Sequence, residues 1–263
     1  MLLGGLQKFS LLDYEGFISA IVFTQGCNLK CRFCYNPMLV WPSGFQSKAS
    51  QFKQKDHCPK IKESDLFEFL KSRAGKLDAV VITGGEPTIQ PDLPRFIAKI
   101  KKLGYLVKLD TNGTNPEMLN DLINPAPFLK PRCKRTGHSK RCGVAKKLID
   151  YIAMDIKGSQ VKYKKITGSA VSFNKIKKSV KIIIESGLPH EFRTTIIPGL
   201  TTQADMREIG KIIKGADKWF LQKIKTDIDL IDNKLKKIKP TSNKELEEMQ
   251  KIGSLYIKQC KIR

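Results

Sequence analysis

Short apolar runs alternate with longer segments of helical spacing along most of the chain. The apolar runs predict six strands, at residues 18–24, 78–83, 105–111, 150–156, 191–197 and 218–224. Between them, segments such as 92–104 and 173–187 repeat apolar residues every three or four positions and end in glycine, a common helix stop. Apolar strands separated by helices predict an α/β fold with a parallel sheet and right-handed crossovers. Six βα units suit either a doubly wound sheet or a partial (open) parallel β/α barrel.

Polar and glycine-rich residues follow almost every predicted strand. These strand ends read TQGC, TGGEPT, DTNGT, MDIKG and RTTIIPG in chain order. In both candidate folds the loops after the strands meet at one face, where chemistry gathers. The pattern therefore predicts one composite site built from several strand ends.

Two segments interrupt this rhythm. Residues 42–62 are rich in lysine, serine and glutamine, and residues 125–147 are strongly basic. We interpret both as loop insertions in a single domain that spans residues 1–263, not as linkers between two domains. After about residue 240 the pattern predicts a helical extension at the C-terminus.

The seven cysteines are better explained as ligands, reactive groups or core residues than as disulfides. No apolar run approaches the ~20 residues that span a bilayer, and the N-terminus lacks the pattern of a signal peptide. These features predict a cytoplasmic location, where thiols stay reduced.

Three of the cysteines, Cys27, Cys31 and Cys34, lie within eight residues. A closed zinc site needs four ligands, and His57 or Cys58 is a candidate for the fourth. Alternatively, three thiolates can hold an iron–sulfur cubane and leave one of its four irons open to a small chelating ligand. The spacing alone leaves both interpretations standing.

Together with TGGEPT one strand later, the C-x3-C-x2-C loop resembles the signature of the radical S-adenosylmethionine (SAM) enzymes. More narrowly, the chain resembles the activating enzymes of glycyl-radical proteins, above all those of anaerobic ribonucleoside-triphosphate reductase. This resemblance rests on the segments around the two motifs and on three further segments, DTNGTNPEML, DYIAMDIKG and EFRTTIIPGLTT. The likeness runs from about residue 6 to about residue 225. It implies the open barrel of the radical SAM type.

The resemblance also implies cofactors, partners and roles for residues. A [4Fe-4S] cluster on Cys27, Cys31 and Cys34 would cleave SAM reductively, and a glycine of a large partner protein, an anaerobic ribonucleotide reductase, would lose a hydrogen atom. A low-potential donor such as flavodoxin or ferredoxin would supply the electron. No side chain is assigned as acid or base. The SAM pocket implied by the resemblance comprises Phe33, Gly84, Gly85, Glu86, Asp110, Thr111, Asn112, Asp155, Lys157 and Arg193, with Gln222 facing the same site.

Within that pocket, Gly84, Gly85 and Glu86 are expected at the methionine end of SAM. Asp155 and Lys157 are expected near its ribose and carboxylate, and Arg193 is expected to bind the carboxylate. The chain departs from many relatives after the third cysteine, where Tyr35 and Asn36 stand in place of histidine and asparagine.

The basic insertion adds a separate hypothesis. Cys133, His138 and Cys142 give a C-x4-H-x3-C pattern that hints at a second metal site, although the spacing matches no standard zinc finger. The insertion is also a candidate for contact with an acidic partner surface.

Two rival functions remain to be weighed, and the net charge of +23 bears on one of them. The lysines are spread along the chain with few interleaved aromatics, which favours a basic solvated surface over a nucleic-acid groove. One rival is therefore remote: a zinc-containing, basic nucleic-acid-binding protein. The nearer rival is a radical SAM enzyme that acts on a small molecule such as a nucleobase precursor. Neither a membrane nor a nucleic-acid partner is expected.

Overall fold

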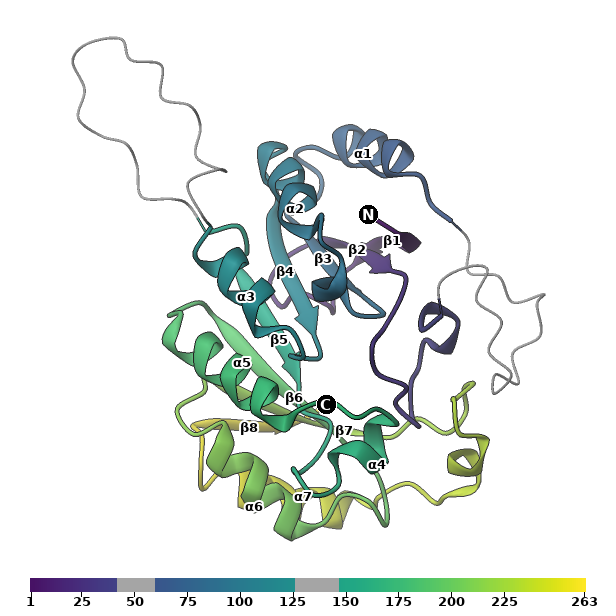
Figure 1. Cartoon of the computed structure of the whole chain (residues 1–263), viewed down its shortest axis with the longest axis vertical. Helices are drawn as coiled ribbons and strands as arrows, with labels where there is room; N and C mark the ends of the chain where they lie inside the picture. Colours follow the sequence, from purple (N-terminus) through teal and green to yellow (C-terminus); the bar gives the residue numbers. More distant parts are fainter. Residues whose placement is uncertain (42–59, 126–146) are drawn as a thin grey trace.

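The computed structural model describes residues 1–41, 60–125 and 147–263. Figure 1 shows a curved sheet with helices packed along its outer side. The sheet has eight strands in chain order: β1 (Leu3–Ser10), β2 (Ser19–Thr24), β3 (Ala79–Gly84), β4 (Leu106–Thr111), β5 (Tyr151–Asp155), β6 (His190–Ile196), β7 (Lys218–Lys223) and β8 (Gln259–Ile262). All neighbouring pairs are parallel except β1 and β2.

The helices connect successive parallel strands, as the sequence pattern predicts. They are α1 (Glu63–Ser72), α2 (Leu93–Lys102), α3 (Pro116–Ile123), α4 (Tyr163–Thr167), α5 (Phe173–Glu185), α6 (Gln203–Ile212) and α7 (Asn243–Gly253). Short 3-10 helices follow β2 and β3, namely η1 (Pro37–Leu39) and η2 (Pro87–Ile89), and η4 (Asn233–Lys237) follows β7. Because β1 and β8 stand at opposite edges of the sheet, the architecture is an open parallel β/α barrel.

The two faces of the sheet bury different kinds of side chain. Along β3, Val80 and Ile82 join the large core under the helices, whereas Ala79 and Val81 join a smaller cluster on the inner face. This alternation follows from the two-residue period of a strand. The inner face is therefore separate from the large core under the helices, and the site described below lies at its carboxyl end.

Two edge strands were missing from the sequence prediction. β1 pairs antiparallel with β2, but its sequence LGGLQKFS carries two glycines and no regular alternation of buried and exposed positions. The C-terminal extension is not helical throughout, because α7 is followed by β8, which pairs with β7. Only Cys260 is buried in that four-residue strand. β1 is irregular and β8 is short, so neither edge strand carries a regular periodic signal.

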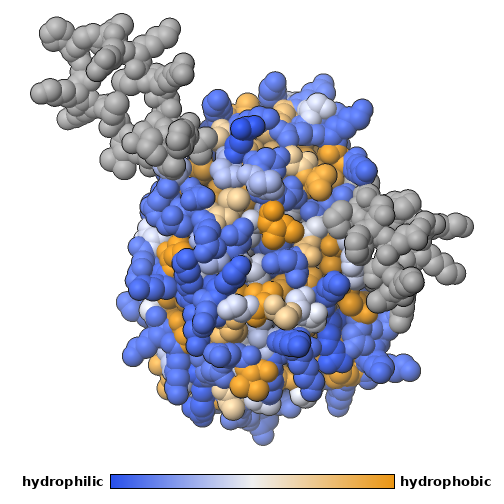
Figure 2. Space-filling view, in the orientation of Figure 1, coloured by the Kyte–Doolittle hydropathy of each residue, from blue (hydrophilic) through white to orange (hydrophobic). Residues whose placement is uncertain are grey.

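The two predicted insertions fall almost wholly on residues 42–59 and 126–146, outside the described residues. Within the described ranges, no helix is long and apolar enough to cross a membrane. Figure 2 shows a face covered largely by hydrophilic side chains with scattered hydrophobic ones, as the high content of lysine and arginine leads one to expect.

A core substitution tests this arrangement. Leu109 is 0% exposed in the central strand β4, so Leu109→Ala should lower the free energy of unfolding by about 2–5 kcal/mol through lost burial and a residual cavity. Leu12 is 86% exposed, so Leu12→Ala should change it by less than about 0.5 kcal/mol. Urea unfolding of both variants measures the difference, and equal costs would contradict the assignment of Leu109 to the core.

Candidate functional site

A cavity of about 300 Å³ opens at the carboxyl ends of the parallel strands, a size common for small-molecule sites. It brings together every cluster and cofactor residue that the sequence predicted outside the basic insertion. These are Cys27, Cys31, Phe33, Cys34, Gly84, Gly85, Glu86, Asp110, Thr111, Asn112, Asp155, Lys157, Arg193 and Gln222. Residues from distant parts of the chain meet here because parallel strands present their carboxyl ends at one edge.

The loop that carries the three cysteines is held by peptide groups. After β2, the Gly26 nitrogen donates to Leu39 O at 2.7 Å, and the Glu86 nitrogen donates to Gly26 O at 2.8 Å. On the other side, the nitrogens of Lys30 and Arg32 donate to carbonyls of α4 at 2.8 and 3.1 Å. The loop is thus anchored before, within and after the cysteine run.

The two glycines after β3 serve this anchoring. A Cβ on Gly85 would lie 2.0 Å from Gly26 O, and a Cβ on Gly84 would lie 2.3 Å from Thr24 N. Gly84 also has a φ of +115°, a conformation that glycine adopts most readily. The close approach that requires glycine is therefore between the ends of β2 and β3, in addition to any approach to a ligand.

The three thiols are largely buried around the cavity. Burial, followed by the charge of Glu86, raises the pKa of Cys27 to about 12. Burial also raises the pKa of Cys31 to about 11, although Lys157 acts in the opposite direction, and it raises the pKa of Cys34. Without a metal the three sulfurs are therefore protonated at neutral pH, and a metal that binds them must displace the protons.

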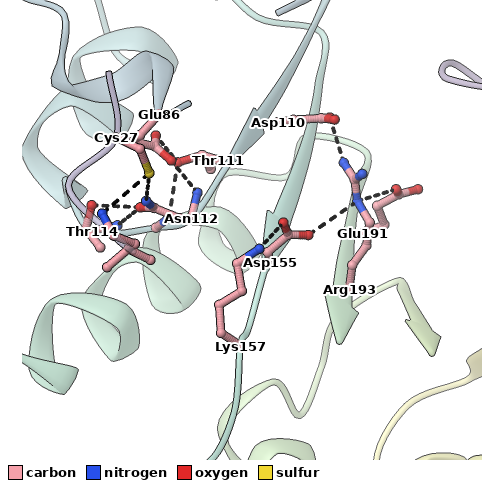
Figure 3. A network of polar contacts seen from close by, with 12 residues as sticks. Cys27, Glu86, Asp110, Thr111, Asn112, Thr114, Asp155, Lys157, Glu191 and Arg193 are labelled. Carbon is pink, nitrogen blue, oxygen red and sulfur yellow. Dashed lines mark hydrogen bonds and ion pairs between the residues drawn. The ribbon is translucent and has the colours of Figure 1, made fainter. Parts of the chain in front are cut away.

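Glu86 is buried at the floor of the site, where it accepts several hydrogen bonds (Figure 3). Thr88 donates to its Oε1 from both nitrogen and hydroxyl, the Thr111 hydroxyl donates at 2.7 Å, and the Asn112 nitrogen donates to Oε2 at 2.6 Å. Burial raises the pKa of Glu86, and these hydrogen bonds oppose the rise. Oε1 has three donors and Oε2 has one, so Oε2 keeps capacity for another donor.

The charged residues of the inner face form one network. Arg193 lies with its Nη2 atom 2.6 Å from Asp110, and its Nε atom is 3.1 Å from Glu191 and 3.8 Å from Asp155 (Figure 3). Lys157 approaches Asp155 at 2.7 Å. Burial opposes ionisation of Asp155, but Lys157 and Arg193 outweigh it and hold the pKa of Asp155 below its usual value.

The aromatic side of the cavity is formed by the cysteine loop itself. Phe33 is buried and lies with its ring 5.5 Å from Lys157 Nζ. Tyr35 lies edge-on to Phe33, and its hydroxyl accepts from the Lys225 nitrogen at 3.0 Å. Tyr35 therefore ties the cysteine loop to the segment after β7.

Sequence reasoning missed several residues of this site. Glu191 and Lys108 belong to the buried charge network, and Asn28 and Thr114 surround the side chain of Asn112. The sequence does carry a signal for Glu191 and Lys108. Each lies two positions from a predicted site residue of the same strand, Arg193 or Asp110, and residues two apart in a strand point to the same face. Asn28 and Thr114 carry no such signal, since loop residues have no fixed period.

The predicted second metal site, Cys133, His138 and Cys142, lies outside the described residues, as do His57 and Cys58. Within the described ranges, no group of three histidine, cysteine, aspartate or glutamate side chains is arranged to hold a single metal ion.

Comparisons with known proteins agree with the motifs. The family model described as the radical SAM superfamily matches residues 21–131. A protein of Methanocaldococcus jannaschii named "Putative glycyl-radical enzyme activating enzyme" is 31% identical over 271 residues, which cover 100% of this chain and 95% of the relative. The 7-carboxy-7-deazaguanine synthase of Aquifex aeolicus is 35% identical over only 99 residues, 38% of each chain.

Among solved structures, Streptococcus suis SuiB bound to S-adenosylmethionine matches with a TM-score of 0.59 and 15% identity. The match covers 91% of this chain and 48% of SuiB, so the chain spans about half of that protein. At this identity the match shows a shared fold.

The contact between Gly85 and Gly26 gives a direct test of how the cysteine loop is held. Gly85→Ala should lower the free energy of unfolding by at least about 1–3 kcal/mol, because the new Cβ would clash with a backbone oxygen. It should also speed chemical labelling of the loop thiols, since Cys31 is only 7% exposed in the intact loop. Urea unfolding and the rate of thiol labelling measure the two effects.

Gly187→Ala is the matched control. Gly187 has a φ of +64°, and a Cβ added there would meet no atom within 4 Å, so its replacement should cost about 1–2 kcal/mol of backbone strain. Labelling of the loop thiols should stay at the wild-type rate. If Gly85→Ala labels as slowly as this control, the loop does not depend on the glycine contact.

Proposed function

Because the chain belongs to the radical SAM superfamily and to its glycyl-radical enzyme activating enzymes, we propose that it installs a glycyl radical on an anaerobic ribonucleotide reductase. The observation that carries the activase assignment is a relative of that type that matches this chain over its whole length, together with a pocket that gathers three thiols and the strand-end motifs. The choice of reductase rests on the resemblance of the motifs around that pocket.

The family uses a [4Fe-4S] cluster and SAM, and the donor set of this pocket fits both. Three thiols line one cavity, and thiolates are the ligands that hold iron–sulfur clusters. Three thiolates leave one iron without a cysteine ligand, so that iron is open to SAM. When bound, the cluster and SAM supply one-electron cleavage of the sulfonium and the power to abstract a hydrogen atom.

The chain's own residues would bind and orient these groups. Cys27, Cys31 and Cys34 would hold three irons. Gly84 and Gly85 would line the methionine end of SAM, where the spare capacity of Glu86 Oε2 suits an ammonium donor. Phe33 would pack beside the ligand, and Asp110, Thr111 and Asn112 would complete the wall.

The charge network refines the expectation for Arg193. Its guanidinium already has three protein carboxylates within 4 Å, so it is better suited to hold Asp110 and Asp155 in place than to bind the carboxylate of SAM. Lys157 has three donors and one close carboxylate partner, Asp155. We therefore assign the carboxylate of SAM to Lys157 and its ribose to Asp155.

The nearer rival is a radical SAM enzyme that acts on a nucleobase precursor, as the likeness to 7-carboxy-7-deazaguanine synthase suggests. That likeness covers 38% of this chain, whereas the activase-type relative covers all of it. The proposal also includes a low-potential electron donor, flavodoxin or ferredoxin, and a cytoplasmic location, where the cluster cysteines stay reduced.

The cluster can be tested by iron content and by product formation. Anaerobically reconstituted protein should bind about four irons at this site and form 5′-deoxyadenosine from SAM when reduced. Alanine in place of Cys27, Cys31 or Cys34 should abolish that product, because each substitution removes one thiolate. Cys260→Ala is the control, since Cys260 packs near Trp219 and Gly253 in another part of the fold and its loss should spare both iron and product. Product formation by a triple variant of the loop cysteines would refute the site.

The proposed substrate can be tested by its radical signal. Reduced protein with SAM should generate an organic radical signal, seen by electron paramagnetic resonance, on an anaerobic ribonucleotide reductase with a C-terminal glycyl-radical segment. Replacement of that glycine by alanine in the reductase should remove the signal, because a methyl group then takes the place of one of the two Cα hydrogens and crowds the approach to the other. Formation of 7-carboxy-7-deazaguanine from its precursor, detected by mass spectrometry, together with no radical on the reductase, would favour the rival.

A further inference from the structure

The sulfur of Cys27 has two hydrogen-bond donors nearby. The Leu29 nitrogen lies 3.4 Å from Sγ, as expected within a tight loop. The second donor, Asn112 Nδ2, lies 3.9 Å from Sγ and comes from the end of β4, 85 residues away in sequence (Figure 3). The side chain of the residue that follows β4 thus reaches the sulfur of a cysteine in the loop.

The surrounding hydrogen bonds determine which end of the Asn112 amide faces the sulfur. The Thr114 nitrogen and hydroxyl both donate to Asn112 Oδ1, at 3.0 and 2.7 Å. Asn28 Oδ1 accepts from Asn112 Nδ2 at 3.1 Å. A reversed amide would place its NH2 group against the backbone N–H of Thr114, so the group directed at Cys27 is a donor.

The same residue also contacts the acid nearest to this thiol. The Asn112 nitrogen donates to Glu86 Oε2 at 2.6 Å, and the negative charge of Glu86 disfavours further negative charge on Cys27. The backbone of Asn112 therefore holds Glu86, whose charge disfavours negative charge on the sulfur of Cys27. The side chain of Asn112 acts in the opposite direction, because it donates to that sulfur. Glu86 and Asn112 are both buried, and hydrogen bonds and charges act more strongly in a buried environment than in water.

Hydrogen bonds to the ligand sulfurs of an iron–sulfur cluster help to set its reduction potential, because they stabilise the more negative, reduced form. We infer that Asn112 is a positioning residue that raises the reduction potential of the cluster through its amide N–H on Cys27. The inference rests on the proposed function, since it requires the cluster at Cys27. Its consequence is an easier transfer of one electron from the low-potential donor.

Two substitutions separate this role from a structural one. Asn112→Asp keeps an oxygen that accepts from Thr114, so it preserves the turn, but it replaces the donor at Cys27 with a negatively charged acceptor. Asn112→Ala removes the donor and adds no charge. Asn28→Ala is the control, because it removes a neighbour of the amide while Thr114 still holds its orientation.

The reduction potential of the reconstituted cluster is measured by anaerobic redox titration followed by absorbance and electron paramagnetic resonance. At the wild-type midpoint potential, Asn112→Ala should hold on the order of tenfold less reduced relative to oxidised cluster, equivalent to about 59 mV for one electron. Asn112→Asp should shift the potential further in the same direction, and Asn28→Ala should shift it less than either.

The outcomes are distinguishable. Wild-type protein that binds no cluster would refute the proposed function and this inference together. A wild-type cluster with unshifted Asn112→Ala and Asn112→Asp variants would overturn the inference alone, and so would a wild-type potential in Asn112→Asp with a shift only in Asn112→Ala, since that pattern indicates a structural role. Failure of Asn112→Ala to load iron would show that the amide is needed for assembly and would also overturn the tuning role.

Discussion

The contact of Arg193 with three carboxylates is the interaction on which the inner face of the barrel depends. Asp110, Asp155 and Glu191 come from three successive strands, and each lies within 4 Å of the guanidinium. A buried charge without its partner costs several kcal/mol, so the strands must keep the register that brings these groups together. A slip of one residue would turn the charges toward the apolar core under the helices. The network is thus weak evidence for net stability and strong evidence for a specified geometry.

The opposite wall of the cavity is positioned by different forces. Peptide groups hold the cysteine loop through Gly26, Leu39 and α4, and none of these hydrogen bonds uses a thiol. The sulfurs can therefore exchange protons for metal without loss of the contacts that shape the loop. Side-chain charges hold one wall and backbone hydrogen bonds hold the other, so binding at the thiols does not have to rearrange the charge network. This division suits a site that must be present before its cofactor arrives.

Hydrophobic periodicity predicts the six central strands, and the motifs at the strand ends predict one composite site, because both are local signals with a known spatial consequence. The barrel class and the individual pocket residues come from the resemblance to the radical SAM enzymes, since periodicity alone also suits a doubly wound sheet. It fails at the edge strands β1 and β8, because β1 lacks a regular alternation of buried and exposed residues and β8 has only four residues. The contact of Arg193 with the carboxylate of SAM stays a prediction, and the sequence does not reveal that three protein carboxylates share the face of Arg193. Likewise, the sequence indicates that another group comes close to the backbone at Gly85, but only the structure shows that this group is the carbonyl oxygen of Gly26. Pairings between distant loops, such as Asn112 with Cys27, have no local pattern to reveal them.

The separation of paired and unpaired charge bears on how the chain meets other molecules. Inside the cavity, Asp110, Asp155 and Glu191 face Arg193 and Lys157, so these charges largely compensate one another. The surplus of 23 positive charges in the whole chain is therefore not a property of the pocket. Net charge of this kind acts on the rate of encounter and weakens as salt screens it, whereas the chemistry depends on short contacts. An acidic electron donor and an acidic partner protein would both be attracted, so charge alone does not choose between them, and selection must come from the shape and contacts at the mouth of the barrel.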